Sequence, residues 1–224
     1  LGWGGYWGWD PVENASLVPW LIATIILHFQ FGAHKNKGFF KPMISASIFG
    51  YIFVVYGSFL TRSGVLGDFS VHSFSGGDIG LLLGGVVALL TMLGFFVLAF
   101  KWQDIPAGEI YDGVSNPNFL LVAAMLVIVV MAIIVTFGMS LPFISGITGK
   151  GTAVQSAFYN KTMGPLFVVL LVMLFAYYIR RKGIAFGSAI IHGGVVVMAA
   201  GIFISGFLAQ DTQEQFVVGQ PVDF

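Results

Sequence analysis

Six long runs of apolar residues constrain the fold of this 224-residue chain more than any other feature. Each run approaches or exceeds the roughly 20 residues that a helix needs to cross a hydrocarbon core of about 30 Å. An open sheet edge cannot face lipid, and the sequence lacks the short alternating segments of a membrane β-barrel. We therefore predict an all-α fold, a polytopic transmembrane helix bundle with about six spans, at residues 15–33, 42–60, 79–101, 119–141, 164–179 and 187–208.

The composition supports this prediction and excludes several classes of protein. Hydrophobic residues make up 57% of the chain and charged residues 9%, whereas soluble domains carry about 25% charged residues. The absence of Cys excludes disulfides and thiolate metal sites, and a net charge of zero argues against nucleic acid as a partner. Because the chain begins at Leu1 inside a motif and shows no signal peptide pattern, we expect a fragment, a split subunit or a short variant.

The distribution of Lys and Arg predicts the orientation of the bundle. The loops after the first, third and fifth spans hold seven of the 10 Lys and Arg residues, and positive loops stay on the cytoplasmic side. We therefore expect one membrane domain over residues 1–224, whose outer side carries the start of the chain, two loops and the tail. These outer segments are residues 1–14, 61–78, 142–163 and 209–224.

Two of the four histidines are predicted to lie inside the membrane at matching depth. His28 and His192 each lie about five residues from the inner end of their span, which corresponds to roughly 7 to 8 Å at about 1.5 Å per residue. With no thiolate or intramembrane carboxylate to complete a zinc site, a haem iron with two axial imidazoles fits this pair best. The alternative is that each imidazole only bonds to a neighbouring helix. His34 is interpreted as an interfacial residue.

The start of the chain, LGWGGYWGWDPVEN, alternates glycines with aromatic rings. Trp and Tyr are common at membrane interfaces, so an ordinary aromatic belt is one interpretation. The glycines also let the backbone approach a flat partner closely, so the segment suits a planar apolar ligand such as porphyrin. Asp10, just before Pro11, is counted among the residues of this outer cofactor site and is also interpreted as a helix cap. The predicted stacking residues are Trp3, Tyr6, Trp7 and Trp9.

Four stretches of the chain together resemble a known family. The first, LGWGGYWGWDPVENASLVPWL, is similar to the tryptophan-rich signature (WWD motif) of the haem-handling proteins of cytochrome c biogenesis, and its DPVENASLVPW portion resembles CcmF-type cytochrome c haem lyase subunits. The other three, FLTRSGVLGDFSVHSF, TFGMSLPF and FYNKTMGPL, resemble further signatures of the same family. The resemblance covers most of the chain from Leu1 to His192.

This resemblance implies a cytochrome c haem lyase subunit of the inner (cytoplasmic) membrane, with its motif on the periplasmic side. It would receive haem from a haem chaperone and promote thioether attachment to the CXXCH motif of apocytochrome c, alongside other membrane subunits of cytochrome c maturation. His72 matches the family's outer iron ligand. His28 and His192 match the pair of histidines that holds a resident haem b, and quinol is a candidate electron donor to that haem. No catalytic residue is assigned, because proximity accounts for the reaction.

Some residues and alternatives remain open at this stage. Arg62, the only Arg of the outer side, is a candidate partner for a haem propionate, or simply a positive charge at a helix end. The family's outer histidine upstream of the motif has no counterpart here, and the additional helices that the family commonly has before His192 are missing. Two other functions remain: a haem transporter or exporter, and a non-catalytic membrane scaffold of the maturation complex.

Overall fold

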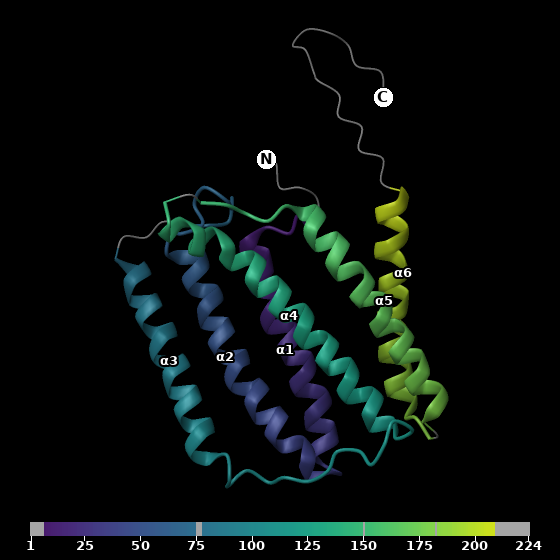
Figure 1. Ribbon diagram of the computed structural model, residues 1–224. Helices are drawn as coiled ribbons and strands as arrows, with labels where there is room; N and C mark the ends of the chain where they lie inside the picture. Colours follow the sequence, from purple (N-terminus) through teal and green to yellow (C-terminus); the bar gives the residue numbers. More distant parts are fainter. Residues whose placement is uncertain (1–6, 75–77, 150, 182, 209–224) are drawn as a thin grey trace, which may run out of the picture. The chain divides into compact units, whose positions relative to one another are not determined.

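The computed structural model describes residues 7–74, 78–149, 151–181 and 183–208, and six α-helices run through them (Figure 1). All six are long and apolar enough to cross a membrane, and the described residues contain no strand, so the predicted all-α bundle is confirmed and the chain is a multi-pass membrane protein. A short 3-10 turn, η1, occupies Lys37–Phe39. The helices are α1 (Pro11–Ala33), α2 (Phe40–Arg62), α3 (Ile79–Lys101), α4 (Pro117–Ile147), α5 (Ser156–Arg180) and α6 (Phe186–Leu208).

The chain divides into two compact units, Leu1–Arg180 and Arg181–Phe224. In the first unit, α1 packs against both α2 and α4, while α3 packs on α2 and α5 on α4. The five helices therefore follow the order α3, α2, α1, α4, α5, with α1 in the middle (Figure 1). The described part of the second unit is centred on α6.

The core of the first unit lies where α1, α2 and α4 meet. Its most deeply buried side chains are fully inaccessible: Val18, Leu60, Leu66, Val135 and Met139. Gly57 allows the backbones of α1 and α2 to approach, because a Cβ there would lie only 3.0 Å from the carbonyl oxygen of Ala15. Small residues at such crossings are how membrane helices gain packing contacts.

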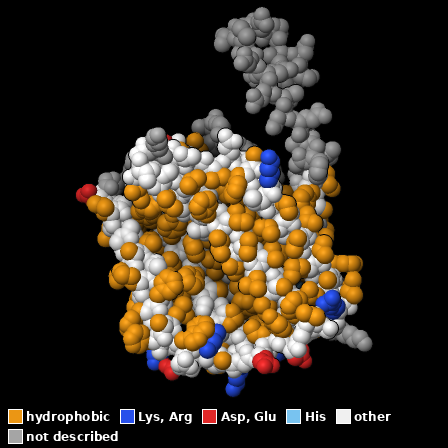
Figure 2. All heavy atoms as spheres, in the orientation of Figure 1, with side chains coloured by type: hydrophobic (Ala, Val, Ile, Leu, Met, Phe, Trp, Pro, Cys, Tyr) orange, Lys and Arg blue, Asp and Glu red, His pale blue; other side chains and the backbone are white. Residues whose placement is uncertain are grey.

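The outward faces of the helices are apolar instead of polar. On α3, Leu81 is 85% exposed, and Leu82, Met92 and Phe100 are also exposed. Figure 2 shows hydrophobic side chains across the middle of the visible face of the first unit, with charged side chains gathered toward its two ends. A surface of this kind faces lipid, which agrees with the six predicted spans.

Two helix boundaries differ from the sequence-based prediction. Helix α4 continues through the buried Pro142 to Ile147, and α5 begins at Ser156, so the predicted outer loop 142–163 is largely helical. The hydroxyl of Ser145 donates to the Leu141 carbonyl at 2.6 Å beside this proline. Membrane helices tolerate an interior proline more readily than soluble helices do, and α4 agrees with this because it continues for five residues beyond Pro142.

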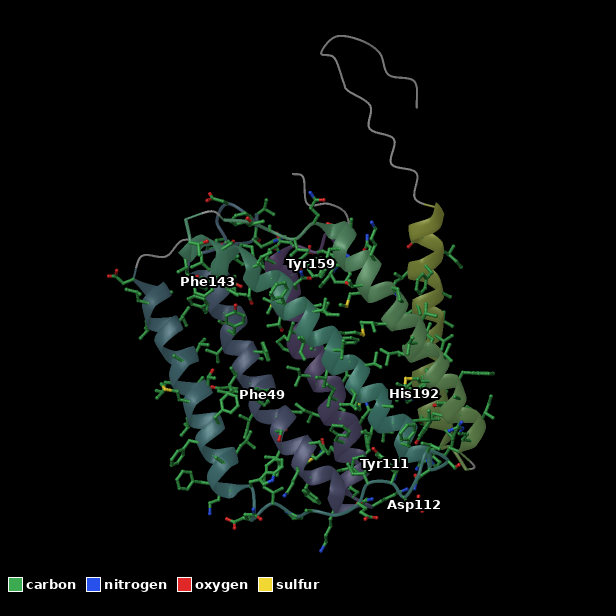
Figure 3. All side chains as sticks on the ribbon, in the orientation of Figure 1. Phe49, Tyr111, Asp112, Phe143, Tyr159 and His192 are labelled. Atoms are coloured by element: carbon green, nitrogen blue, oxygen red, sulfur yellow. The ribbon has the colours of Figure 1, made fainter. Side chains whose placement is uncertain are left out.

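At the end of the first unit where α1 ends, the connection between α3 and α4 makes hydrogen bonds with the residues that follow α1. The Asn36 side-chain amide donates to the carbonyls of Glu109 and Ile110. Asn116 donates to Asp112, and this hydrogen bond lowers the pKa of the Asp112 carboxyl below its usual value. Figure 3 shows Asp112 at one end of the unit and Tyr159 near the other.

Candidate functional site

The start of α1 is held by a capping box. The Asp10 carboxylate accepts a hydrogen bond from the Val12 amide at 2.7 Å, and the Glu13 carboxylate accepts from the amides of Gly8 and Asp10 at 2.9 and 3.2 Å. Reciprocal bonds of this type satisfy amide groups that the first turn of a helix leaves unpaired. The predicted capping role of Asp10 is therefore confirmed, and the segment before it is fixed to the helix.

Trp9 anchors the tryptophan-rich segment in the bundle. Its ring stacks on Tyr159 with centroids 4.9 Å apart, and its indole Nε1 donates to the Asn160 side-chain oxygen at 2.7 Å. Its backbone has a φ of 57°, a conformation that costs a non-glycine residue about 1–3 kcal/mol. The fully buried Asn14 donates to the Trp9 carbonyl at 3.1 Å, so side chains from two helices hold this strained residue.

The other predicted aromatic residues are placed only in part. The ring of Trp7 meets that of Trp9 edge to face, with centroids 5.9 Å apart. Trp3 and Tyr6 lie outside the described residues. The described part of the cluster is thus a pair of perpendicular rings, of which Trp9 has one face committed to Tyr159.

The loop after α2 folds back onto the start of α1. Ser70, which is buried, donates through its hydroxyl to the Asp10 carboxylate at 2.7 Å and accepts from the His72 amide at 3.1 Å. The Nδ1 atom of His72 then lies 3.7 Å from Asp10 Oδ1. The sequence-based prediction that His72 and the tryptophan-rich motif lie at the same end of the bundle is confirmed.

A cavity of about 610 Å³ opens at this end of the first unit, within the range of about 300–1,000 Å³ that is usual for ligand sites. It is lined from three separate parts of the chain: residues 8–13, residues 67–72 and residues 153–156. Trp9, Phe69, Val71 and Val154 contribute apolar surface, and His72 contributes an imidazole. Among the residues that the structure describes, the lining includes the carboxylates of Asp10, Glu13 and Asp68 and no Lys or Arg.

Arg62 does not line this cavity. It lines a second hollow of about 490 Å³ between α1 and α2, together with Pro19, Gly57 and Ser58. Its guanidinium carbon lies 5.5 Å from the centre of the Phe74 ring. The structure therefore does not bring Arg62 and His72 into one cavity, and a role for Arg62 beside a propionate stays a prediction.

The two intramembrane histidines share one local geometry. The Nδ1 atom of His28 lies 2.7 Å from the Thr24 carbonyl, and that of His192 lies 2.8 Å from the Ser188 carbonyl, each four residues earlier in its own helix. A carbonyl oxygen only accepts, so Nδ1 carries the proton in both rings and the lone pair of the neutral imidazole is on Nε2. This is the tautomer that metal-ligating histidines adopt when a carbonyl orients them.

The pairing of these histidines stays a prediction. His28 lies in α1 of the first unit. His192, which is labelled in Figure 3, lies in α6 of the second unit. Each is half-buried. His34 is exposed at the C-cap of α1, in agreement with its predicted place at the helix end.

Sequence reasoning missed four polar or aromatic residues that build the site: Asn14, Ser70, Tyr159 and Asn160. All four fall inside the quoted motifs, in DPVENASLVPW, FLTRSGVLGDFSVHSF and FYNKTMGPL. The signal was thus present as polar and aromatic residues inside motifs, but the sequence does not say which of them meet.

Comparison with known proteins concerns the part of the chain that contains the tryptophan-rich segment. Residues 1–66, which include the tryptophan-rich segment, α1 and α2, match the family model described as Cytochrome C assembly protein. A probable cytochrome c-type biogenesis protein NrfE of Escherichia coli is 30% identical over 99% of this chain and 40% of its own length. The cytochrome c-type biogenesis proteins CycK of Rhizobium meliloti and CcmF of Pseudomonas fluorescens are each 32% identical over 78% of this chain and 26% of their own lengths. No solved structure matches.

The fold is that of a polytopic membrane protein, with a cavity at one end of the helices of its first unit. The chain is similar to the CcmF, NrfE and CycK proteins of cytochrome c-type biogenesis, so the resemblance predicted from its motifs is confirmed. It spans between about a quarter and two fifths of the length of these relatives.

Proposed function

We propose that this chain is a haem-handling membrane part of a cytochrome c maturation protein. Its cavity would receive haem as a substrate, His72 would ligate the iron, and the protein would promote thioether attachment of the haem to the CXXCH motif of apocytochrome c. The observation that carries this proposal is the cavity itself, in which Trp9 of the tryptophan-rich segment and His72 of the loop after α2 come together.

The chemistry of the lining fits a haem. A porphyrin needs apolar and aromatic surface, which Trp9, Phe69 and Val71 supply, and an imidazole for the iron, which His72 supplies. Two of the three carboxylates are already committed: Glu13 accepts from backbone amides, and Asp10 accepts from Val12 and Ser70. Because the described residues of the lining include no Lys or Arg, the propionates of a bound haem would lie toward the open rim of the cavity.

The protein's contribution would be positioning. Thioether formation adds the S–H of a Cys across a vinyl group of the haem, so the sulfur bonds to one carbon and the proton goes to the other. No protein nucleophile is needed for this addition, and holding the vinyl group beside the thiol supplies the rate gain by proximity. The open rim of the cavity would leave room for the apocytochrome segment.

A resident haem b would occupy the membrane. The imidazoles of His28 and His192 would hold its iron, since each carries its lone pair on Nε2. It would supply electrons that keep the incoming iron reduced, with quinol as their source. The proposed partners are a haem chaperone, apocytochrome c and other membrane subunits of cytochrome c maturation, in the inner membrane with the cavity facing the periplasm.

The structure gives less support to a haem transporter or exporter. Such a protein needs a polar path through its helices. The span hydroxyls of Ser45, Ser47 and Thr91 each donate to a carbonyl of their own helix, so these groups serve the backbone instead of a path.

Reduced-minus-oxidised spectra of the purified protein test the resident haem. We expect a b-type signal in the wild type that is lost in His28→Ala and in His192→Ala. His34→Ala is the matched control, because His34 lies on the same helix as His28 but is exposed at its end, and its signal should persist. A signal retained in both ligand variants would contradict the assignment, and a protein without haem would favour a scaffold.

Titration with added haem tests the outer site. We expect the wild type to bind one haem beyond the resident haem, and His72→Ala to lose that second binding event while the b-type signal stays. Attachment of haem to an apocytochrome peptide should fall with it. If His72→Ala binds the second haem as the wild type does, the cavity is not the haem site.

A further inference from the structure

We infer that Asp10 is a positioning residue for His72: its carboxylate directs the imidazole so that Nε2 faces the cavity. This inference rests on the proposed role of His72 as an iron ligand and deepens it. Asp10 would act through the histidine and would not itself touch the iron. Its capping of α1 would be only one of two functions of the same carboxylate.

A single oxygen atom is the meeting point of α1 and the loop. Asp10 Oδ1 accepts from the Val12 amide at 2.7 Å and from the Ser70 hydroxyl at 2.7 Å, and it lies 3.7 Å from His72 Nδ1. The Asp10 side chain is only 16% exposed and that of His72 is 33% exposed. The carboxylate is therefore held rigidly from the helix side and faces the imidazole in a largely enclosed place.

Ser70 fixes the histidine from the loop side. Its hydroxyl donates to Asp10 and accepts from the His72 amide at 3.1 Å, so the backbone of His72 is tied to the same carboxylate. At 3.7 Å the two side chains are farther apart than the usual 2.7–3.2 Å of a hydrogen bond. With both backbones held, a small side-chain rotation is enough to close this distance.

The direction of the ring follows from this arrangement. A carboxylate only accepts, so a His72 ring that turns Nδ1 to Asp10 carries its proton on Nδ1 and its lone pair on Nε2. An iron bound at Nε2 makes the Nδ1–H group a stronger donor, which tightens its bond to the carboxylate. Pairs of carboxylate and histidine of this kind orient metal ligands and increase their basicity.

The hydrogen bonds of the cap do not by themselves require a charge, although a carboxylate at a helix N-terminus also interacts favourably with the helix dipole. Asn caps helices about as well as Asp, because an amide oxygen also accepts from the first-turn amides. An Asp10→Asn variant therefore keeps an acceptor for Val12 and Ser70 while it removes the charge that would strengthen the His72 imidazole. This substitution separates the two functions of the side chain.

The experiment compares Asp10→Asn with Asp68→Asn in the protein loaded with its resident haem. Asp68 is the matched control, since it lines the same cavity from the His72 loop and its substitution removes the same charge. For Asp10→Asn we expect the affinity for the added haem to fall about 10- to 100-fold, as for other partners of metal ligands. The midpoint potential of the added haem's iron should rise more in Asp10→Asn than in Asp68→Asn, because the His72 imidazole that ligates it becomes less basic.

Asp68→Asn should not weaken haem binding, because loss of a negative charge favours an anionic porphyrin. Equal haem affinity and equal potential in the two variants would overturn the inference. If Asp10→Asn lowers the thermal stability of the protein, Ser70→Ala provides a second test. This variant keeps the Asp10 charge and removes the hydroxyl that aligns Asp10 with His72. We expect a smaller loss of haem affinity than in Asp10→Asn, and no loss would again overturn the inference. Failure of His72→Ala to lose the second haem would contradict the proposed function instead.

Discussion

Helices α1 and α3 have the same length of 23 residues but opposite places in the first unit. Within the most hydrophobic stretch of each, a third of α1 is buried and only 6% of α3. Yet α3 is the more hydrophobic of the two. The helix at the centre of the first unit thus carries polar residues, such as Asn14 and His28, and the more apolar of the two helices faces outward.

This difference shows how burial works in a membrane. Lipid chains are as apolar as Leu, so hydrophobic side chains gain little by leaving lipid, and helices associate through close packing and hydrogen bonds. Gly57 against Ala15 and Gly138 against Tyr159 supply the packing, while Asn14 and Trp9 supply hydrogen bonds. Sequence features that mark the buried helix are therefore small and polar residues, not hydropathy.

The largest expected effect is the difference in stability between substituting a tightly packed glycine and substituting a glycine on an outward helix face. A Cβ at Gly138 would overlap the Tyr159 hydroxyl and ring, whereas a Cβ at Gly85 of α3 meets nothing within 4 Å. We expect Gly138→Ala to destabilise the protein by about 3 kcal/mol through overpacking, and Gly85→Ala to be neutral or slightly stabilising. Reversible unfolding in mixed detergent measures both, and equal stabilities would remove the distinction between the two helix faces.

A leucine pair sharpens the comparison. Leu60 of α2 is completely buried, and Leu89 of α3 is 60% exposed. Leu60→Ala should leave a cavity and cost about 2 kcal/mol, at the low end for buried leucines because a leucine gains little by leaving lipid and only its packing contacts are lost. Leu89→Ala should change the unfolding free energy by less than about 0.5 kcal/mol. A larger loss in Leu89→Ala would mean that α3 is covered by protein.

The smallest effect tests the polar contact of the tryptophan-rich segment. Trp9→Phe keeps a ring that can stack on Tyr159 but loses the indole donor to Asn160, so we expect a loss of about 1 kcal/mol. Trp20→Phe is the matched control, because Trp20 is 59% exposed on the outer face of α1. Thermal stability in detergent compares them, and an effect of the control as large as that of Trp9→Phe would assign the change to the membrane interface.

Much of the fold could be predicted from the sequence, because a span must be long and apolar wherever it packs. The boundaries at Pro142 and Ser156 could not, since whether a proline ends a membrane helix depends on the groups that surround it. At the site, the cap at Asp10 follows from local sequence, and the shared end of His72 and the motif follows from the number of spans between them. The stack of Trp9 on Tyr159 and the separate location of Arg62 do not.

The sequence by itself determined the membrane spans, the start of α1 at its capping box and the motifs that relate the chain to cytochrome c-type biogenesis proteins. These properties depend on neighbouring residues and on the thickness of the bilayer. Only the tertiary structure decided that Asp10, Ser70 and His72 meet around one carboxylate oxygen. The physical reason is that about 60 residues, including α1 and α2, separate Asp10 from the loop that holds Ser70 and His72. Only the packing of α1 on α2 brings Asp10 and this loop together.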